Sequence, residues 1–96
     1  MSQSVSILCR PVPTGFLCEV VVGSDAAATL HNVTVSRADL ASLAPGHYDP
    51  QRLVAASFDF LLAREPRESI LRSFELPLIE RYFPGYAAEM RRRMAG

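Results

Sequence analysis

The stretch LVAASFDFLLAREPRESIL, from Leu53 to Leu71, decides the fold of this chain. At 100° per residue, its first half repeats apolar side chains at the i, i+4, i+7 and i+8 spacing of an amphipathic helix. Those on the central stripe are Val54, Phe58, Leu61 and Leu62, and Leu53, Ser57 and Phe60 widen it. The residues left for solvent are Arg52, Ala56, Asp59 and Ala63. A helix this apolar needs cover on two sides, so we expect Phe58 to be fully buried against a sheet.

Both ends of this central helix carry sequence signals. Asp49 is a favourable N-cap, and Pro50 suits the first helical position, where its missing N–H costs nothing. Tyr48 and Leu53 occupy the two positions of a hydrophobic staple. Pro66 disfavours helical geometry at the residue before it. Together these signals predict a helix that ends at about Arg64.

Three segments before that helix have the composition of β-strands. Residues 4–10 and 16–22 are rich in β-branched or alternating side chains, and residues 29–35 are half polar, as expected for an edge strand or a strand with one face buried. The connections are too short for a parallel crossover, which predicts an antiparallel meander. Residues 1–96 therefore form one small α+β domain, in which a three-stranded antiparallel β-meander precedes the central helix and short C-terminal helices that pack on one sheet face.

Prolines and caps divide the other helical segments. Ser36 and Asp39 have the spacing of a capping box, which predicts a short helix directly after the third strand. Residues 68–74 have helical spacing and a favourable i, i+4 ion pair, so a helix is expected there. A single turn over residues 77–83 lies between two prolines, and residues 85–94 form the last helix.

The composition sets the class of protein and its compartment. The 96 residues are 49% hydrophobic and carry a formal net charge of +0, so no global field attracts nucleic acid or an anionic membrane. No apolar run is long enough for a membrane span, and no signal-peptide pattern begins the chain, so we expect a cytoplasmic protein. Cys9 and Cys18 lie opposite one another in the predicted hairpin and are expected to be free thiols packed as small apolar groups. A disulfide or a pair of metal ligands is the alternative.

The sequence contains no recognisable catalytic or cofactor-binding pattern. There is no G-x-S-x-G or H-E-x-x-H motif, and the five glycines are too dispersed for a phosphate-binding loop. His31 and His47 do not complete a zinc pattern with the two cysteines. We therefore expect no enzyme, no cofactor and no metal site.

The C-terminal half contains the candidate binding surfaces. Charges crowd around Pro66, and the aromatic and aliphatic side chains that follow are too dense for one small core to bury. Tyr82 or Phe83 is therefore expected to be exposed, and to be covered by another protein or a homodimer mate. The full predicted partner surface is Arg64, Arg67, Arg81, Tyr82, Phe83 and Tyr86. The basic run Arg91, Arg92 and Arg93 is interpreted as a solvated helix cap, with contact to nucleic-acid phosphate as the alternative.

Parts of the sequence resemble two groups of proteins. The run L-x-R-E-P-x-E-S-I-L-x-x-F-x-L-x-x-I-x-x-Y-F-P, from Leu62 to Pro84, resembles a group of short uncharacterised bacterial proteins, which implies a bacterial cytoplasmic protein. FLCEVVVGSD and DPQRLVAASFDFLL are similar, at the level of fold only, to segments of HicB-type antitoxins. We expect a protein–protein interaction or regulatory module. The alternative is a nucleic-acid-binding regulator, or an antitoxin-like partner, that uses the C-terminal arginines.

Overall fold

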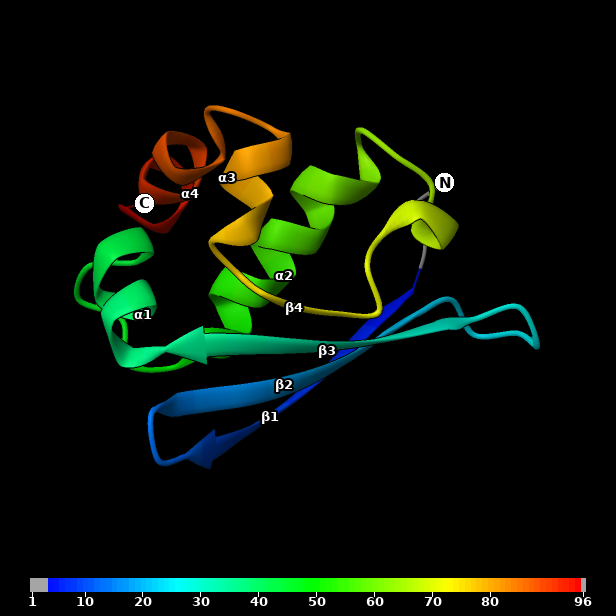
Figure 1. Cartoon of the computed structure of the whole chain (residues 1–96), viewed down its shortest axis with the longest axis horizontal. Coiled ribbons are helices and arrows are strands. Elements are labelled where there is room, and N and C mark those ends of the chain that lie inside the picture. The colour runs from blue at the N-terminus through cyan, green and yellow to red at the C-terminus, as the bar shows by residue number, and fades with distance from the viewer. Residues whose placement is uncertain (1–3, 96) are drawn as a thin grey trace.

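One mixed sheet of four strands carries the helices on one of its faces (Figure 1). The computed structural model describes residues 4–95. Three antiparallel strands come first, and a short fourth strand pairs in parallel with the third, so the strand order is β1-β2-β3-β4. The strands are β1 (Val5–Val12), β2 (Gly15–Val22), β3 (Thr29–Ser36) and β4 (Ser73–Glu75). The predicted α+β class and the antiparallel meander are confirmed.

The alternating pattern of the meander determines which sheet face is covered. Val20 of β2 and the valines of β3 point towards the helices and are fully buried, whereas the intervening side chains lie on the open face. β1 and β2 are joined by the two residues Pro13 and Thr14. Pro11 does not end the first strand as expected, because β1 lies at the sheet edge and continues to Val12.

The predicted helix over residues 68–74 is wrong. Of the two alternatives for β3, the structure shows the strand with one face buried and not the edge strand. Arg67–Ser69 forms one 3-10 turn, η1, after which the chain extends alongside β3. The Asn32 amide donates to the Arg72 carbonyl over 2.8 Å, and the Leu76 amide donates to the Thr34 carbonyl over 3.0 Å. The unpaired backbone groups of β3 thus compete successfully for this segment. The expected Glu68–Arg72 pair does not form, since Glu68 contacts Arg67.

The capping signals of the first two helices are confirmed. α1 (Arg37–Leu43) begins with both hydrogen bonds of the predicted capping box, and α2 (Pro50–Leu62) begins where the Asp49 carboxylate accepts from the Gln51 amide. The hydrophobic staple is wrong, because Tyr48 is 91% exposed. Ala56 is buried rather than exposed, because the C-terminal helix packs over that side of α2.

Two short helices complete the fold. α3 (Leu78–Tyr82) follows Pro77, and α4 (Tyr86–Ala95) begins after Gly85, whose φ of +100° lets the chain reverse. Three residues of α4 at i, i+4 and i+8 spacing lie in the core, namely Tyr86, Met90 and Met94. No helix among residues 4–95 is long and apolar enough to cross a membrane.

Cys9 and Cys18 form a disulfide, so the prediction of two free thiols is wrong. The predicted register is correct, since the two residues are direct partners across the hairpin with their Cα atoms 4.0 Å apart. At that separation, two thiols that face the same side of the sheet are within bonding reach. The cytoplasmic location stays a prediction, and the bridge weighs against it because the cytosol keeps most thiols reduced.

The first prediction concerns Phe58, which is fully buried as expected and packs between α2 and the sheet. Phe58→Ala should lower the free energy of unfolding by about 3–5 kcal/mol, through lost apolar burial and the cavity that remains. Thermal and denaturant melts measure this loss. A shift of only one or two degrees would contradict the placement of Phe58 at the centre of the core.

The second prediction concerns the disulfide. Protein denatured under acid quench without reductant should show no free thiol, and reduction should release two. Replacing both cysteines by serine should lower the free energy of unfolding by about 2–3 kcal/mol, the value expected for closing a loop of this length. Two free thiols in the untreated protein would restore the original prediction.

Candidate functional site

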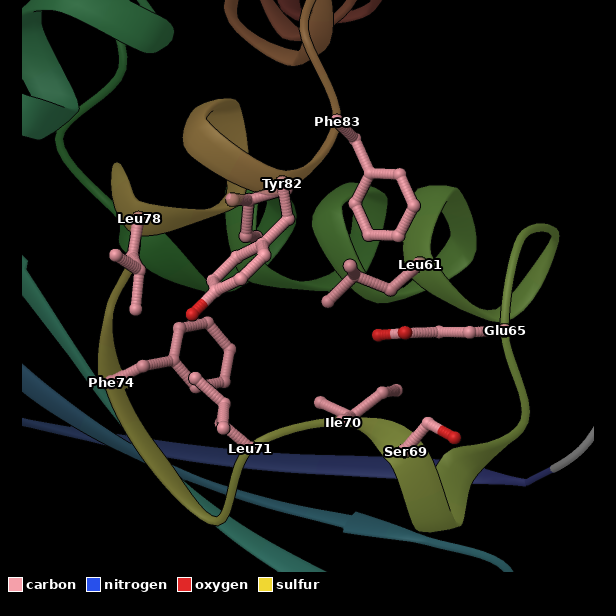
Figure 2. Close-up of a pocket in the computed structure, with 10 residues that line it drawn as sticks. Leu61, Glu65, Ser69, Ile70, Leu71, Phe74, Leu78, Tyr82 and Phe83 are labelled. Atoms are coloured by element: carbon pink, nitrogen blue, oxygen red, sulfur yellow. The ribbon is translucent and has the colours of Figure 1, made fainter.

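An apolar pocket of about 310 Å³ opens between the end of α2, the segment that leads into β4, and α3 (Figure 2). Its lining is mostly aliphatic and aromatic, and its polar side-chain groups are one carboxylate and the hydroxyls of a serine and a tyrosine. The lining residues are Leu61, Glu65, Ser69, Ile70, Leu71, Phe74, Leu78, Ile79, Tyr82 and Phe83. Figure 2 shows the Tyr82 ring beside Phe74, with Leu61 and Phe83 above the opening and Ile70 below it.

The local chain geometry explains why this pocket exists. Pro66 ends α2 and Pro77 interrupts the segment after β4, so three short elements meet where one long helix would fill the space. Ile70 and Ile79 are almost fully buried and form the floor. At the rim, Leu71 is 46% exposed and Tyr82 is 64% exposed. The pocket is thus continuous with an exposed apolar rim.

Glu65 supplies the one carboxylate of the pocket lining. Its amide donates to the Leu61 carbonyl over 2.9 Å, which fixes the residue at the last turn of α2. The carboxylate points into the space between Leu61 and Ile70 (Figure 2). Partial burial raises the pKa of this carboxyl. An ionised Glu65 would therefore be stabilised by a cation or a hydrogen-bond donor at this position.

His31 of β3 holds the Leu71 side of the pocket. Its Nδ1 lies 2.7 Å from the Leu71 carbonyl, and its Nε2 lies 2.9 Å from the Thr29 hydroxyl. The carbonyl can only accept, so Nδ1 carries the proton, and Nε2 accepts from Thr29 in the neutral ring. Burial lowers the pKa of His31, and Arg72 adds to this, while the bond to the Leu71 carbonyl opposes it.

The three aromatic residues of the predicted partner surface differ in their exposure. Tyr82 is exposed at the rim, as expected, and Phe83 lines the pocket while packing edge-on against Phe60 at 6.2 Å. Tyr86 is wrong as a surface residue, since it is fully buried. The turn at Gly85 directs its ring into the core, where its hydroxyl lies 2.6 Å from Ser57 Oγ.

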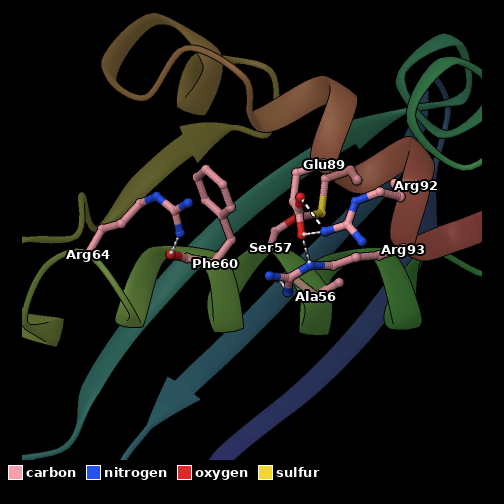
Figure 3. Close-up of polar contacts among 8 residues, drawn as sticks. Ala56, Ser57, Phe60, Arg64, Glu89, Arg92 and Arg93 are labelled. Atoms are coloured by element: carbon pink, nitrogen blue, oxygen red, sulfur yellow. Dashed lines mark hydrogen bonds and ion pairs between the residues drawn. The ribbon is translucent and has the colours of Figure 1, made fainter.

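The three arginines of that surface have separate roles. Arg64 lies over the Phe60 ring at 3.5 Å and donates to the Phe60 carbonyl (Figure 3). Arg67 is largely buried and contacts Asp25, Glu68 and the backbone region of Gly23, so it joins η1 to the β2–β3 turn and exposes little surface to a partner. Arg81 is exposed beside a shallower hollow of about 280 Å³ between α1 and α3.

The basic run of α4 is engaged within the molecule. Arg91 donates to the Ser42 carbonyl and hydroxyl of α1. Arg92 and Arg93 both pair with Glu89, at 2.6 and 2.7 Å, which lowers the pKa of Glu89 to about 2 (Figure 3). Arg93 also reaches the Ala56 carbonyl at 3.5 Å. Arg91 fastens α4 to α1 and Arg93 fastens it to α2, whereas Arg92 pairs within α4. A phosphate would have to compete with these contacts.

Most of the pocket was not identifiable from the sequence. Glu65, Ile70, Leu71 and Phe74 were assigned to a charged corner or to a helix, because their pairing with β3 is a long-range event. One local signal existed, since Ser73, Phe74 and Glu75 alternate polar and apolar as a strand does. No group of ligating side chains suited to a metal ion occurs between residues 4 and 95.

Comparison of this chain with family models, curated proteins and solved structures finds no match.

The third prediction follows from the lowered pKa of His31. In the folded protein this pKa lies below the unfolded value of about 6.5, so acidification protonates the unfolded chain first. The free energy of unfolding should therefore fall as the pH drops below about 6.5 and level off below the folded pKa. One proton limits the slope to about 1.4 kcal/mol per pH unit.

Urea unfolding of wild type and His31→Gln between pH 7.5 and 5 measures this effect. The wild-type curve should be steeper, and the difference between the two curves isolates His31 because the other titrating groups are shared. Parallel curves for wild type and His31→Gln would contradict a neutral, buried His31.

Proposed function

We propose that this chain is a protein-interaction module that binds an apolar segment of a partner protein in the pocket between α2, β4 and α3. The observation that carries the proposal is the pocket itself, with its buried apolar floor and its exposed rim of Leu71 and Tyr82. Tyrosines beside well-packed apolar pockets are frequent centres of binding energy at protein interfaces.

The lining favours a peptide segment over a small metabolite. Sites for small molecules usually combine apolar walls with several convergent polar groups that fix orientation. Figure 2 shows the Ser69 hydroxyl turned away from the opening, so the remaining polar groups of the lining are the Glu65 carboxylate and the hydroxyl of Tyr82 at the exposed rim. One or two aliphatic or aromatic side chains from a partner would fill the apolar part of this space.

Glu65 adds a chemical preference to the proposed partner. A carboxylate at the edge of an apolar pocket is compensated best by an arginine or lysine, whose apolar stem follows the wall while its charge reaches the acid. The proposed ligand is therefore a short segment with bulky apolar residues and one adjacent basic residue.

The fourth prediction tests the site with matched surface variants. Peptides selected from a displayed random library against the wild type should contain bulky apolar residues, and Leu71→Asp should weaken their binding at least about tenfold by placing a charge at the rim. Leu30→Asp is the control, because Leu30 is 49% exposed, close to the 46% of Leu71, but lies on the open sheet face. Equal binding by the two variants would contradict the proposal.

The role of Glu65 is tested in the same titrations. Glu65→Gln should weaken peptides that carry a basic residue more than matched peptides in which that residue is replaced by alanine. Wild-type binding of the basic peptides should also weaken as the pH falls towards the raised pKa of Glu65. Equal losses for both peptide classes would remove the preference for a basic residue and leave the apolar part of the proposal.

The alternative function, binding of nucleic acid through Arg91, Arg92 and Arg93, has less support. Each of these side chains already has a partner within the chain, so a phosphate would have to displace existing contacts. Salt distinguishes the two functions, since affinity for phosphates falls steeply with salt concentration and an apolar interface changes little. A bacterial regulatory role, including an antitoxin-like one, rests on the resemblances alone.

A further inference from the structure

β1 is an outer strand of the sheet with one side of its backbone unpaired. Within residues 4–95 it pairs only with β2. Two observations show which groups face outwards. The Gly23 amide donates to the Ser4 carbonyl over 2.7 Å, so the even-numbered residues of β1 bond to β2. Cys9 and Cys18 have Cα atoms 4.0 Å apart, which identifies the odd-numbered residues as the non-hydrogen-bonded positions.

The amides and carbonyls of Val5, Ile7 and Cys9 therefore point away from β2, towards the free edge. Pro11 is the next residue in this series and has no N–H to donate, so the complete donor–acceptor set ends at Cys9. The span from Val5 to Cys9 contains no charged residue and no proline, which are the usual protections of an exposed edge.

We infer that two copies of this chain associate through β1, antiparallel and centred on Ile7, so that their sheets join into one of eight strands. In this register Ile7 pairs with Ile7 of the second copy, and Val5 pairs with Cys9 of the second copy. The outward backbone amides and carbonyls of Val5, Ile7 and Cys9 then all have hydrogen-bond partners on both strands. A register centred on Cys9 would instead place Pro11 opposite Ile7 and lose bonds on both sides of the axis.

The side chains are compatible with the same axis. Val5, Ile7 and Cys9 are only half-buried against the core, and a neighbouring strand would cover their exposed parts. On the open face Leu8, which is 70% exposed, would lie opposite Ser6 of the second copy. Arg10 would lie opposite Ser4, so no two like charges face each other.

The disulfide prepares this edge for pairing. It joins the middle of β1 covalently to β2, so β1 is held in its extended conformation before a second copy binds. A strand ordered in advance loses less conformational entropy on association. The contact is a single strand pair and therefore smaller than a standard stable interface, so the dimer should form at protein concentrations on the order of 100 μM.

The experiment compares sedimentation of wild type, Ile7→Pro and Ile7→Ala. Proline at position 7 removes the two central backbone bonds of the dimer without removing a bond to β2, and should raise the dissociation constant at least about 30-fold. Ile7→Ala loses side-chain packing but keeps the amide, and should still dimerise. Circular dichroism verifies that each variant is folded. Wild type that stays monomeric up to about 1 mM, or Ile7→Pro that dimerises as wild type does, would overturn the inference.

Amide hydrogen exchange of the wild type provides a measurement that does not depend on the proline variant folding. The amides of Val5, Ile7 and Cys9 should become protected as the protein concentration rises, whereas the exposed Leu71 region should not change. Flat exchange at these three amides would overturn the inference. A dimer that Leu71→Asp abolishes would also overturn it, and would identify a second copy as the occupant of the pocket described above.

Discussion

The burial of Phe58 is the interaction on which the rest of the structure depends. Its ring lies 5.5 Å from that of His31 in β3 and 6.4 Å from that of Phe74 in β4. One side chain of α2 thus contacts the meander and the strand added after it. The approach of β4 to β3 in turn brings Leu71 within reach of the His31 ring. Together with the backbone hydrogen bonds between β3 and β4, this contact holds the η1–β4 segment against both the sheet and the helix.

The part of the core between α2 and α4 contains polar groups that all have hydrogen-bond partners. Ser57 donates to the Leu53 carbonyl, so the Tyr86 hydroxyl donates to Ser57 Oγ at 2.6 Å. Burial raises the pKa of Tyr86, which keeps it neutral and able to donate. No buried side-chain nitrogen or oxygen among the described residues lacks a partner. α4 is therefore placed on α2 by a specific geometry as well as by apolar burial.

The two proposed binding regions lie on different parts of the molecule and bind through different types of interaction. The pocket between α2, β4 and α3 offers apolar side chains and one acid, which favours a bulky segment with a basic neighbour. The outer edge of β1 offers backbone groups, which favour another extended strand. Because β2 and β3 separate β1 from β4, a dimer joined at β1 would leave the pockets of both copies open.

The amino-acid sequence by itself determined the local elements of this protein: the cap of α2 at Asp49, the capping box of α1, the register of the first hairpin, and the burial of Phe58 and Met90. These follow from side chains a few residues apart, where spacing and backbone preference act directly. The exposure of Tyr82 was also predictable, since the surrounding prolines prevent one helix from burying every aromatic residue.

Only the tertiary structure decided the rest. Residues 73–75 became a strand because the unpaired backbone of β3, about forty residues earlier in the chain, offered hydrogen bonds that outweighed a modest helical pattern. Tyr86 turned inwards and Ala56 became buried because α4 packs on α2. The disulfide required the close approach of two thiols, which only the tertiary structure shows. The hairpin register places the two cysteines opposite one another but does not by itself determine whether they are oxidised. The pocket arises from elements distant in sequence, so its lining could not be identified until those elements were assembled.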